Sequence, residues 1–405
     1  MRSLLLAASF RPALGGIETL LYQTNRRLAE PPLVLAPALP SVRGCCIGVA
    51  GPTSAGPGGL EAANAVAVRR VGINLAGRLA YRSLWYLHPS LHYTQTFWRS
   101  SLQAAKTWRP QVIQAGHVYL APLAWLLARQ LRLPFAVYAY GQEVWRGGRP
   151  MGLKPLDARL RGGALRAADC VLVPGSFTAG LLADWQVKSE RIVTVPYGAD
   201  PRPATTASPS GATLLTVARL IPRKGIDTVI RAMPSLPRDV EYRVVGTGPD
   251  EPRLRHVATS LGVNQRVHFL GRLDDETLAD EYRRCTIFVL PARRTAAGDL
   301  EGYGLVYFEA AAWGRPVIAG RSGGEIDAVV DGETGVLVDG ESIEQVSRTI
   351  RELLADPARL EAMGAAGRHR VETTHNWQAA AAVVDATLAD IVQSAAHSSS
   401  RKATG

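Results

Sequence analysis

The sequence predicts two doubly wound α/β domains joined by a linker. Short runs of branched and aromatic apolar residues alternate with helical stretches along both halves of the chain. Because these runs are apolar on both faces, they suit parallel strands that helices cover on either side. The alternation stops at a segment rich in Pro, Ser, Thr and Ala, from Gly198 to Ala212, and then begins again. At 405 residues the chain is also too long for one typical hydrophobic core.

Strands are expected wherever these apolar runs occur. In the first half they lie at residues 3–8, 32–37, 111–115, 135–140, 170–175 and 191–198. In the second half they lie at residues 212–218, 241–246, 266–271, 286–291, 315–320 and 335–339. We therefore expect the first domain at residues 1–200 and the second at 201–375, with a hinge near residue 205. A helical segment should follow, with residues 394–405 as a disordered tail.

The composition argues against several classes of protein. Hydrophobic residues make up 47% and charged residues 20%, which is ordinary for a globular chain and argues against wholesale disorder. The four cysteines have no metal-ligand spacing and form no disulfide framework, so we expect a reducing, cytoplasmic setting. The apolar run Leu4 to Ala8 is too short for an export signal, and Val118 to Ala128 is too short to span a bilayer.

The positive charge is concentrated in the first half of the chain. Residues 1–200 hold 22 Lys+Arg and 9 Asp+Glu, a net charge of +13, whereas residues 201–405 hold 24 and 26, a net charge of −2. A basic domain beside a nearly neutral one indicates that the first domain meets a polyanion. Nucleic acid and an anionic membrane surface are both candidates.

Two loops of the first half place suggestive residues after predicted strands, where open parallel sheets bind ligands. Gly15 and Gly16 precede a helix, and glycines there let backbone amides approach a phosphate. The alternative is an ordinary helix start with Glu18 as a first-turn charge. His117 follows the strand at 111–115 and suits ligand binding or proton transfer, or else a structural hydrogen bond.

In the second half, one strand-to-helix loop carries two cations. Arg219 and Lys224 lie five residues apart after the strand at 212–218. Two cations at that position suit a pyrophosphate. The alternative is a solvated basic loop.

A second loop of this half leads into an unusually apolar helix. Glu301 precedes a turn with two glycines, residues 302–304, and the helix is expected to begin near Leu305. Glu309 is the one charged residue of that helix, and an unpaired buried carboxylate is costly. The turn exposes amides that suit phosphate, and the two carboxylates suit sugar hydroxyls. The alternatives are a buried salt bridge, for example to an arginine such as Arg315, or a Glu301 at the surface without a role.

Other motifs are absent from the sequence. It contains no Walker A segment, no Asp-x-Asp in a loop after a strand, and no Gly-x-Ser-x-Gly elbow. These absences remove the corresponding phosphate-binding, metal-binding and hydrolase interpretations.

Taken together, these segments resemble the retaining glycosyltransferases of family 4, also called group 1 glycosyltransferases. Glu301 and Glu309 match the family's Glu-x7-Glu signature. The family's other segments occur in the same order over most of residues 1–392: GGIE, AGH, VPYGAD, VARLIPRKG, VGTGP, VIAGRSGG and DGETGVLV. The resemblance implies two Rossmann-like domains facing across a cleft, the GT-B fold. The N-terminal domain would bind acceptor, the C-terminal domain would bind nucleotide sugar, and a helix at 376–393 would return to the N-terminal domain.

The resemblance also implies roles for the candidate residues on the nucleotide side. Gly16 would face the donor phosphate, and Arg219 and Lys224 would hold the pyrophosphate. Glu309 would bind the ribose hydroxyls. Leu273, in the loop after the strand at 266–271, would contact the base.

On the sugar side, the resemblance implies two residues close to the chemistry. Glu301 would bind the donor sugar, and His117 would touch the sugar and assist catalysis. The backbone amides around Tyr303, Gly304 and Leu305 would contact the phosphate and sugar.

The implied reaction is transfer of a hexose from a nucleoside diphosphate with retention at the anomeric carbon, without a metal or other cofactor. Within the family, the sequence is nearest to mannosyltransferases that act on phosphatidylinositol-type lipids with GDP-mannose. We therefore expect mannose as the sugar and a lipid or glycan as the acceptor. Two segments depart from the family pattern. Gly323 to Asp327 replaces Gly-Gly-x-Pro-Glu, and Tyr140 to Trp145 replaces His-Gly-x-Asp with Glu143 as its acid.

The segment Tyr81 to Ser100 combines aromatic residues with arginines. Tyr81, Trp85 and Tyr86 could contact the acceptor or an anionic bilayer, or they could fill the core of the domain. We expect a cytoplasmic enzyme, peripheral on the inner face of the cytoplasmic membrane, with no nucleic-acid partner. Two alternatives stay open: a nucleotide-sugar epimerase of the same two-lobed fold, and a basic nucleic-acid-binding protein without enzyme activity.

Overall fold

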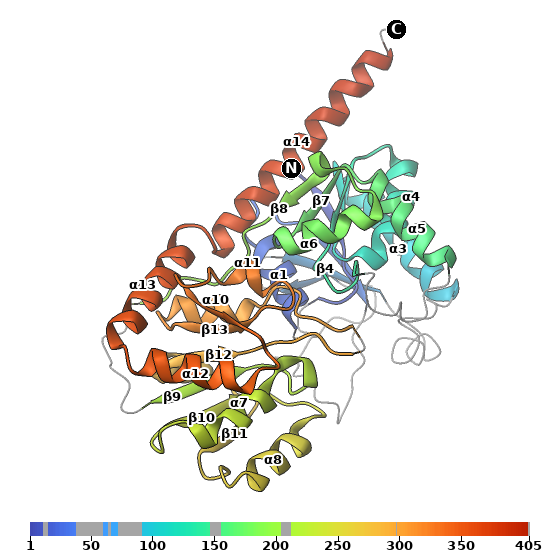
Figure 1. Ribbon diagram of the computed structural model, residues 1–405. Helices are drawn as coiled ribbons and strands as arrows, with labels where there is room; N and C mark the ends of the chain where they lie inside the picture. Colours follow the sequence, from blue (N-terminus) through green and yellow to red (C-terminus); the bar gives the residue numbers. More distant parts are fainter. Residues whose placement is uncertain are drawn as a thin grey trace. The chain divides into compact units, whose positions relative to one another are not determined.

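The chain forms two compact units, which we describe separately. The computed structural model describes residues 1–10, 15–37, 60–63, 66–71, 91–145, 155–203, 212–296 and 298–403. Unit 1 comprises residues 1–174, 178–195 and 377–405, and unit 2 comprises residues 175–177 and 196–376 (Figure 1). The chain thus leaves unit 1, builds unit 2 and returns to unit 1. Residues 204–211 of the expected linker lie outside the described residues.

Unit 1 is built on an eight-stranded sheet with the order β3-β4-β2-β1-β5-β6-β7-β8. Its neighbours pair in parallel, except that β3 and β4 are antiparallel. The strands are β1 Ser3–Leu6, β2 Leu33–Pro37, β3 Leu60–Ala63, β4 Val66–Val71, β5 Val112–Ala115, β6 Phe135–Tyr138, β7 Cys170–Val173 and β8 Ile192–Thr194. Every strand predicted for the first half is confirmed. β3 and β4 were missed because charged residues, such as Arg69 and Arg70, interrupt their apolar pattern.

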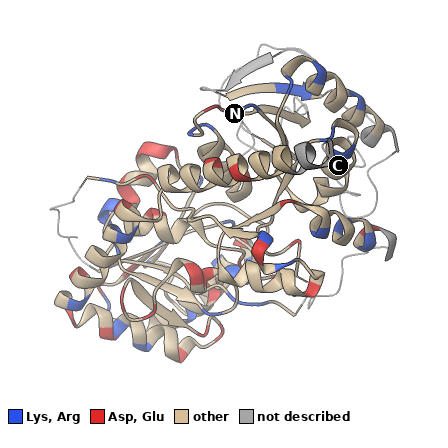
Figure 2. Cartoon of the chain, turned by 90° about the horizontal axis from the view of Figure 1, so that it is seen from above, with Lys and Arg blue, Asp and Glu red and all other residues tan. Residues whose placement is uncertain are grey.

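Helices pack on this sheet. They are α1 Gly16–Asn25, α3 Leu91–Trp108, α4 Ala121–Leu131, α5 Pro155–Ala167, α6 Ser176–Leu181 (whose first two residues fall in unit 2) and α14 Trp377–Ala403. Short 3-10 turns lie at Val118–Leu120, Leu182–Trp185 and Ser189–Arg191. Among the charged residues of α3, α4 and α5, Lys and Arg outnumber Asp and Glu. Figure 2 shows Lys and Arg in blue and Asp and Glu in red on the described chain.

The C-terminal helix α14 belongs to unit 1, where it contacts α1 and β7. Oδ2 of Asp385 accepts a hydrogen bond from the backbone N–H of Ala29 at 2.7 Å. The helix continues through Ala403, although a disordered tail was expected from residue 394. Figure 1 shows its C-terminal part running beyond the sheet of unit 1. Helix-favouring residues such as Gln393, Ala395 and Ala396 account for the continuation.

Unit 2 is built on a six-stranded parallel sheet with the order β11-β10-β9-β12-β13-β14. The strands are β9 Thr213–Val217, β10 Glu241–Val245, β11 Val267–Gly271, β12 Ile287–Leu290, β13 Val317–Gly320 and β14 Gly335–Val338. Each lies within a run that the sequence predicted. The fold class of two doubly wound α/β domains is therefore confirmed.

Short connections join the strands of unit 2 to its helices. The helices are α7 Ile226–Ala232, α8 Glu251–Ser260, α9 Asp275–Arg284, α10 Leu305–Ala312, α11 Glu325–Ala328, α12 Ile343–Leu354 and α13 Pro357–Thr373, with 3-10 turns at Pro222–Lys224 and Met233–Ser235. The core is formed by apolar side chains of the strands and of α7, α8 and α12, for example Leu214, Val229 and Ile350, all fully buried. Loops that follow β9, β12 and β13 emerge at the carboxyl ends of neighbouring strands, where such sheets bind ligands.

Within the part of the chain that the structure describes, one helical stretch, Pro357–His397, is long and apolar enough to cross a membrane by length and composition. Helices that cover a core meet the same criterion. The two helices of this stretch contact other helices, because α13 contacts α10 and α14 contacts α1.

Candidate functional site

The loops after β9 and β12 meet in a buried ion-pair cluster of unit 2. Oε2 of Glu301 accepts hydrogen bonds from Nζ of Lys224 at 2.5 Å and from Nη1 of Arg223 at 2.9 Å. Glu301 and Lys224 are 7% and 9% exposed, so little solvent screens the pair. The structure therefore brings two of the predicted site residues, Lys224 and Glu301, into direct contact.

The electrostatics of this cluster keep Glu301 ionised. Burial alone would raise the pKa of its carboxyl, but the charges and hydrogen bonds of Lys224 and Arg223 outweigh that effect and lower the pKa to about 2. One carboxylate with two cations leaves a net positive charge at the end of β9. That charge suits a phosphate-bearing ligand.

Arg219, the other predicted phosphate ligand, differs from Lys224 in its surroundings. It follows β9 directly, its side chain is exposed, and it makes no ion pair with any residue that the structure describes. The fold therefore does not use this cation internally, and it remains accessible to a ligand.

The turn at 302–304 leads directly into α10, which begins at Leu305 as the sequence predicts. Gly304 has a φ of +87°, and a Cβ there would lie 2.3 Å from the ring of Tyr307. The position therefore requires glycine for both reasons. Tyr303 is buried, and its hydroxyl donates to the carbonyl of Tyr197 at 2.7 Å. The backbone N–H groups from Tyr303 to Leu305 thus lie on an anchored turn at a positive helix end.

Glu309, the lone charged residue of α10, is half-buried and has no cationic partner among the described side chains. Its Oε2 accepts a hydrogen bond from the hydroxyl of Tyr282 at 2.8 Å. Burial raises the pKa of Glu309, and the Tyr282 hydrogen bond and the charge of Arg202 oppose that rise. The alternative of a salt bridge to Arg315 is wrong, because the Arg315 guanidinium donates to the carbonyl of Arg283.

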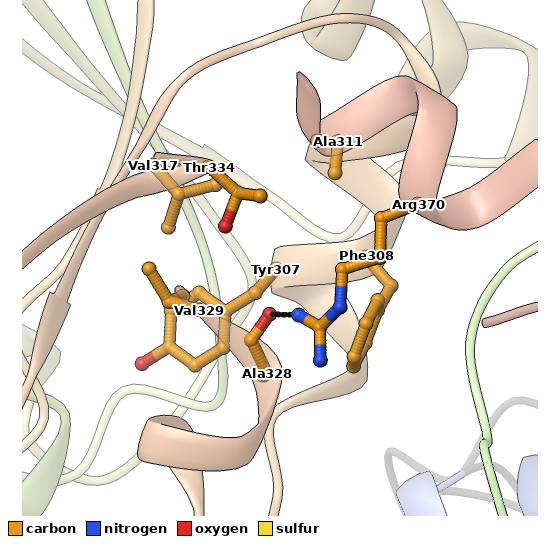
Figure 3. A pocket seen from close by; sticks show the side chains of 9 residues that line it. Tyr307, Phe308, Ala311, Val317, Ala328, Val329, Thr334 and Arg370 are labelled. Carbon is orange, nitrogen blue, oxygen red and sulfur yellow. Dashed lines mark hydrogen bonds between the residues drawn. The ribbon is translucent and has the colours of Figure 1, made fainter. Parts of the chain in front are cut away.

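The buried side of α10 offers no space for a ligand. Figure 3 shows Tyr307, Phe308 and Ala311 facing a void that Val329, Thr334 and Arg370 also line. Its volume is about 10 Å³, barely room for one water molecule. Arg370 closes it by donating to the carbonyl of Ala328 at 2.5 Å. This void is part of the packing of unit 2.

Leu273 lies where the sequence places it, between the end of β11 and α9, and is half-buried. Asp274 beside it caps α9 by accepting from the N–H of Thr277 at 2.8 Å. This cap fixes the loop that presents Leu273.

In unit 1, the loops after β1 and β5 border a cavity of about 120 Å³. Its lining residues are Ala8, Ser9, Ile17, Glu18, Leu21, Gly116 and His117. Glu18 accepts a hydrogen bond from the hydroxyl of Ser9. Gly16 is the first residue of α1, and a Cβ on it would meet no atom within 4 Å. Packing therefore gives no reason for glycine there, and the backbone is open to a ligand.

His117 is buried beside this cavity and is neutral at physiological pH. Burial lowers its pKa to about 3, and the positive charge of Arg161 adds to the effect. Nδ1 accepts from the backbone N–H of Tyr119 at 3.3 Å, so the proton of the neutral ring lies on Nε2. The ring also stacks on Tyr119, with centroids 4.6 Å apart. This histidine suits donation of a hydrogen bond better than proton transfer at neutral pH.

Glu143, in the segment that departs from the family pattern, accepts from the backbone N–H of Tyr140 at 2.6 Å. Burial raises its pKa to about 6, although hydrogen bonds and the charge of Arg161 oppose the rise. The candidate acceptor residues Tyr81, Trp85 and Tyr86 lie outside the described residues.

Sequence reasoning missed two residues of this region. Arg223 joins Lys224 on Glu301, and its place beside Lys224 in the same loop was the available signal. Glu325 is completely buried next to the loop after β13. The signal there was an acid at the variable position of the Gly-Gly-x-Pro-Glu pattern.

Two family descriptions match the chain. Residues 202–370 match "Glycosyl transferases group 1". Residues 26–198 match "Glycosyl transferase 4-like domain". Together they cover most of both units.

Similar proteins of known activity include three GDP-mannose-dependent mannosyltransferases. An alpha-(1-6)-phosphatidylinositol monomannoside mannosyltransferase of Mycolicibacterium smegmatis is 44% identical over 169 residues, 41% of this chain and 44% of that protein. A monoacylated alpha-(1-6)-phosphatidylinositol monomannoside mannosyltransferase of Corynebacterium glutamicum is 43% identical over 181 residues, 44% and 46% of the two chains. The chain thus spans less than half the length of these two relatives. An alpha-(1-6)-phosphatidylinositol monomannoside mannosyltransferase of Mycobacterium tuberculosis is 36% identical over 282 residues, 65% of this chain and 72% of that protein.

Solved structures of other proteins share the fold. HepE of Anabaena in complex with UDP has a TM-score of 0.73 at 17% identity, covering 96% of this chain and 100% of that chain. Sucrose-phosphate synthase of Thermosynechococcus elongatus has a TM-score of 0.74 at 22% identity, covering 97% and 99%. At these identities the likeness establishes the fold alone.

Proposed function

Because the chain belongs to the group 1 glycosyltransferases, we propose that it transfers a hexose from a nucleoside diphosphate sugar to a lipid or glycan acceptor. The observation that carries this proposal is the cluster at one edge of the unit 2 sheet. There the ion pair of Lys224 with Glu301 joins the loops that follow the neighbouring strands β9 and β12, the loop after β12 leads into the N-terminus of α10, and the exposed Arg219 lies in the loop after β9. Cations, helix amides and carboxylates are the groups that a sugar diphosphate requires.

We propose GDP-mannose as the donor. Three similar proteins are named as GDP-mannose-dependent mannosyltransferases, at 36–44% identity. In this assignment Arg219 and Lys224 hold the diphosphate, Glu309 accepts from the ribose hydroxyls, and Leu273 contacts the base. Tyr282 supports the role of Glu309, since its hydrogen bond to one carboxylate oxygen leaves the other for the ligand.

The chemistry at the sugar follows from the charges of the cluster. As the bond to the diphosphate breaks, negative charge grows on the leaving group, and the cations and the amides of Tyr303, Gly304 and Leu305 stabilise it. Glu301 accepts from sugar hydroxyls, and the Nε2–H of His117 donates to the sugar. Gly16 offers an open backbone to the phosphate. Retention at the anomeric carbon is part of the proposal.

We also propose that transfer needs no metal. Within the part of the chain that the structure describes, no three His, Cys, Asp or Glu side chains are grouped as metal ligands. Activity that persists in excess EDTA supports this part of the proposal, and activity restored only by a divalent cation contradicts it.

For the acceptor we propose a phosphatidylinositol-type glycolipid, presented at the inner face of the cytoplasmic membrane. The relatives named above act on phosphatidylinositol monomannosides, and residues 1–200 carry a net charge of +13. Basic residues are attracted to anionic lipid headgroups. Stronger sedimentation with vesicles containing phosphatidylinositol than with neutral phosphatidylcholine vesicles supports the membrane assignment, and equal, negligible binding to both contradicts it.

The decisive experiment is a transfer assay with radiolabelled GDP-mannose and vesicles that contain phosphatidylinositol monomannoside. We expect label in the lipid fraction, released by α-mannosidase, with UDP-glucose as a poor donor. A reaction on the nucleotide sugar without any acceptor would instead indicate an epimerase. The comparisons favour neither that alternative nor a nucleic-acid-binding protein.

A further inference from the structure

Glu325 is a buried carboxyl for which the proposed chemistry has no direct role. It begins α11, immediately after the loop 322–324 that follows β13, and it is 0% exposed. Its Oε1 accepts from the backbone N–H of Ser322 at 2.6 Å and from the Ser322 hydroxyl at 2.7 Å. Its Oε2 is buried without a hydrogen-bond partner among the described residues. A buried charged oxygen left without a partner is costly, so its protonation state and its neighbours matter.

The loop that Glu325 holds through Ser322 also contacts the backbone of Glu301. The N–H of Gly324 donates to the carbonyl of Glu301 at 2.8 Å. A Cβ added to Gly323 would lie 2.3 Å from that same carbonyl oxygen and 3.1 Å from Oε2 of Glu325. The loop 322–324 is therefore pressed between the Glu325 carboxyl and the residue whose side chain pairs with Lys224.

No described cation forms an ion pair with Glu325. Burial raises its pKa, the hydrogen bonds from its own backbone and from Ser322 lower it, and the negative charge of Glu301 raises it. Burial raises the pKa of the Tyr307 phenol on α10, and the charge of Glu325 adds to that rise. With a proton on Oε2, the carboxyl carries no charge and becomes a hydrogen-bond donor.

We propose that Glu325 is a positioning residue for Glu301: it holds the loop 322–324 against the Glu301 backbone and thereby aims the Glu301 carboxylate at the donor sugar. This inference rests on the proposed function. It assigns a role to an acid at the variable position of the Gly-Gly-x-Pro-Glu pattern, directly before the two positions at which this chain departs from that pattern. The hydrogen bonds from Ser322 to Oε1 of Glu325 are the contacts on which this role depends.

The test compares binding of GDP-mannose and of GDP by calorimetry, because only the former carries the sugar that Glu301 meets. We expect Glu325→Ala to weaken the binding of GDP-mannose at least tenfold, while the affinity for GDP stays within twofold of the wild-type value. We expect Glu325→Gln to keep both affinities within twofold, because its amide oxygen can accept the two Ser322 hydrogen bonds that Oε1 accepts. Equal loss for both ligands in Glu325→Ala, or loss of the GDP-mannose preference in Glu325→Gln, would overturn the proposal. If Glu325→Ala does not fold, the glutamine variant alone decides.

A second measurement detects the charge state of Glu325 by its effect on how the Tm depends on pH. A carboxyl with a raised pKa in the fold contributes stability that is fully present below its unfolded value of 4.5 and is lost as the pH rises through the folded pKa. We expect the Tm of the wild type to fall relative to Glu325→Gln as the pH rises above 4.5. Parallel Tm curves for the two proteins would overturn the protonated state. Titration of Glu301 does not interfere, because its pKa of about 2 lies below this window.

Failure of this inference is distinguishable from failure of the proposed function. A wild-type protein that binds neither GDP nor GDP-mannose would overturn the proposed function, and with it the aiming of Glu301 at a sugar.

Discussion

The ammonium group of Lys224 donates to Oε2 of Glu301 across 2.5 Å, although the two residues are 77 positions apart in the chain. Both side chains are buried, and Arg223 binds the same oxygen. Lys224 therefore has two roles: it balances an internal charge in the fold, and two further N–H groups of its ammonium remain for a phosphate. The cluster links the stability of unit 2 to its ability to bind a diphosphate.

The first prediction separates these two roles. We expect Lys224→Ala to lose GDP binding and to destabilise the free protein by roughly 3 kcal/mol, because it leaves a buried carboxylate with half of its cations. Arg219→Ala is the matched control, since Arg219 is exposed and has no ion-pair partner among the described residues. It should weaken GDP binding without changing the Tm. Calorimetry and thermal unfolding measure the two effects, and equal Tm values for both variants would contradict the dual role.

The second prediction concerns acid. The pKa of Glu301 is about 2 in the fold against an ordinary value of 4.5. A lowered pKa contributes stability above the unfolded value, and that stability is lost as the pH falls through the folded value. Glu301 should therefore contribute roughly 3 kcal/mol above pH 4.5 that disappears towards pH 2. We expect Glu301→Gln to flatten the decrease in Tm between pH 4.5 and 2. An unchanged acid slope would argue against the ion pair in solution.

The third prediction tests Glu309 as the ribose ligand. Glu309→Gln should weaken the binding of GDP about tenfold or more, because a hydrogen bond to a charged group is lost. The Tm should change little, because the amide oxygen still accepts from Tyr282. The sharper measurement uses 2′-deoxy-GDP in a double cycle. The wild type should discriminate GDP from 2′-deoxy-GDP and Glu309→Gln should not, whereas equal discrimination by both would place the ribose elsewhere.

The fourth prediction concerns the turn before α10. Gly304→Ala combines a strained φ of +87° with a contact between the new Cβ and the Tyr307 ring. Gly332→Ala is the control, because its φ is +82° but a Cβ there meets no atom within 4 Å. We expect Gly332→Ala to lower the free energy of unfolding by about 1 kcal/mol and Gly304→Ala to lower it at least twice as much. Only Gly304→Ala should also weaken the binding of GDP. Equal decreases in Tm for the two variants would show that the Tyr307 ring moves aside.

The fold was largely readable from the sequence, because parallel strands buried on both faces form unbroken apolar runs. β9, with the sequence TLLTV, is one example, and β12, with IFVL, is another. β4 was missed because its sequence VAVRRV places Arg70, a buried residue, within the strand. Charge at a buried strand position removes the pattern on which the prediction depends. The expectation that the two domains face one another across a cleft stays a prediction.

The candidate site was only partly readable. Motif spacing placed Glu301, Lys224 and Glu309 in strand-to-helix loops or at a helix start, because local order in the chain determines those positions. Motif spacing could not show that Glu301 pairs with Lys224, or that Glu309 accepts a hydrogen bond from the Tyr282 hydroxyl. Tertiary packing creates both contacts. The neutral state of His117 was equally hidden, since it depends on burial and on Arg161.

The return of α14 to unit 1 has a consequence for biosynthesis. Residues 1–174 leave the ribosome about two hundred positions before the helix Trp377–Ala403 that packs on α1. Until α14 is synthesised, the surface of α1 that α14 contacts in the finished protein stays uncovered. Such a state favours aggregation or capture by chaperones. Maturation of the early half therefore depends on the late arrival of one helix, and a nascent chain stopped after unit 2 should be degraded far faster than the finished protein.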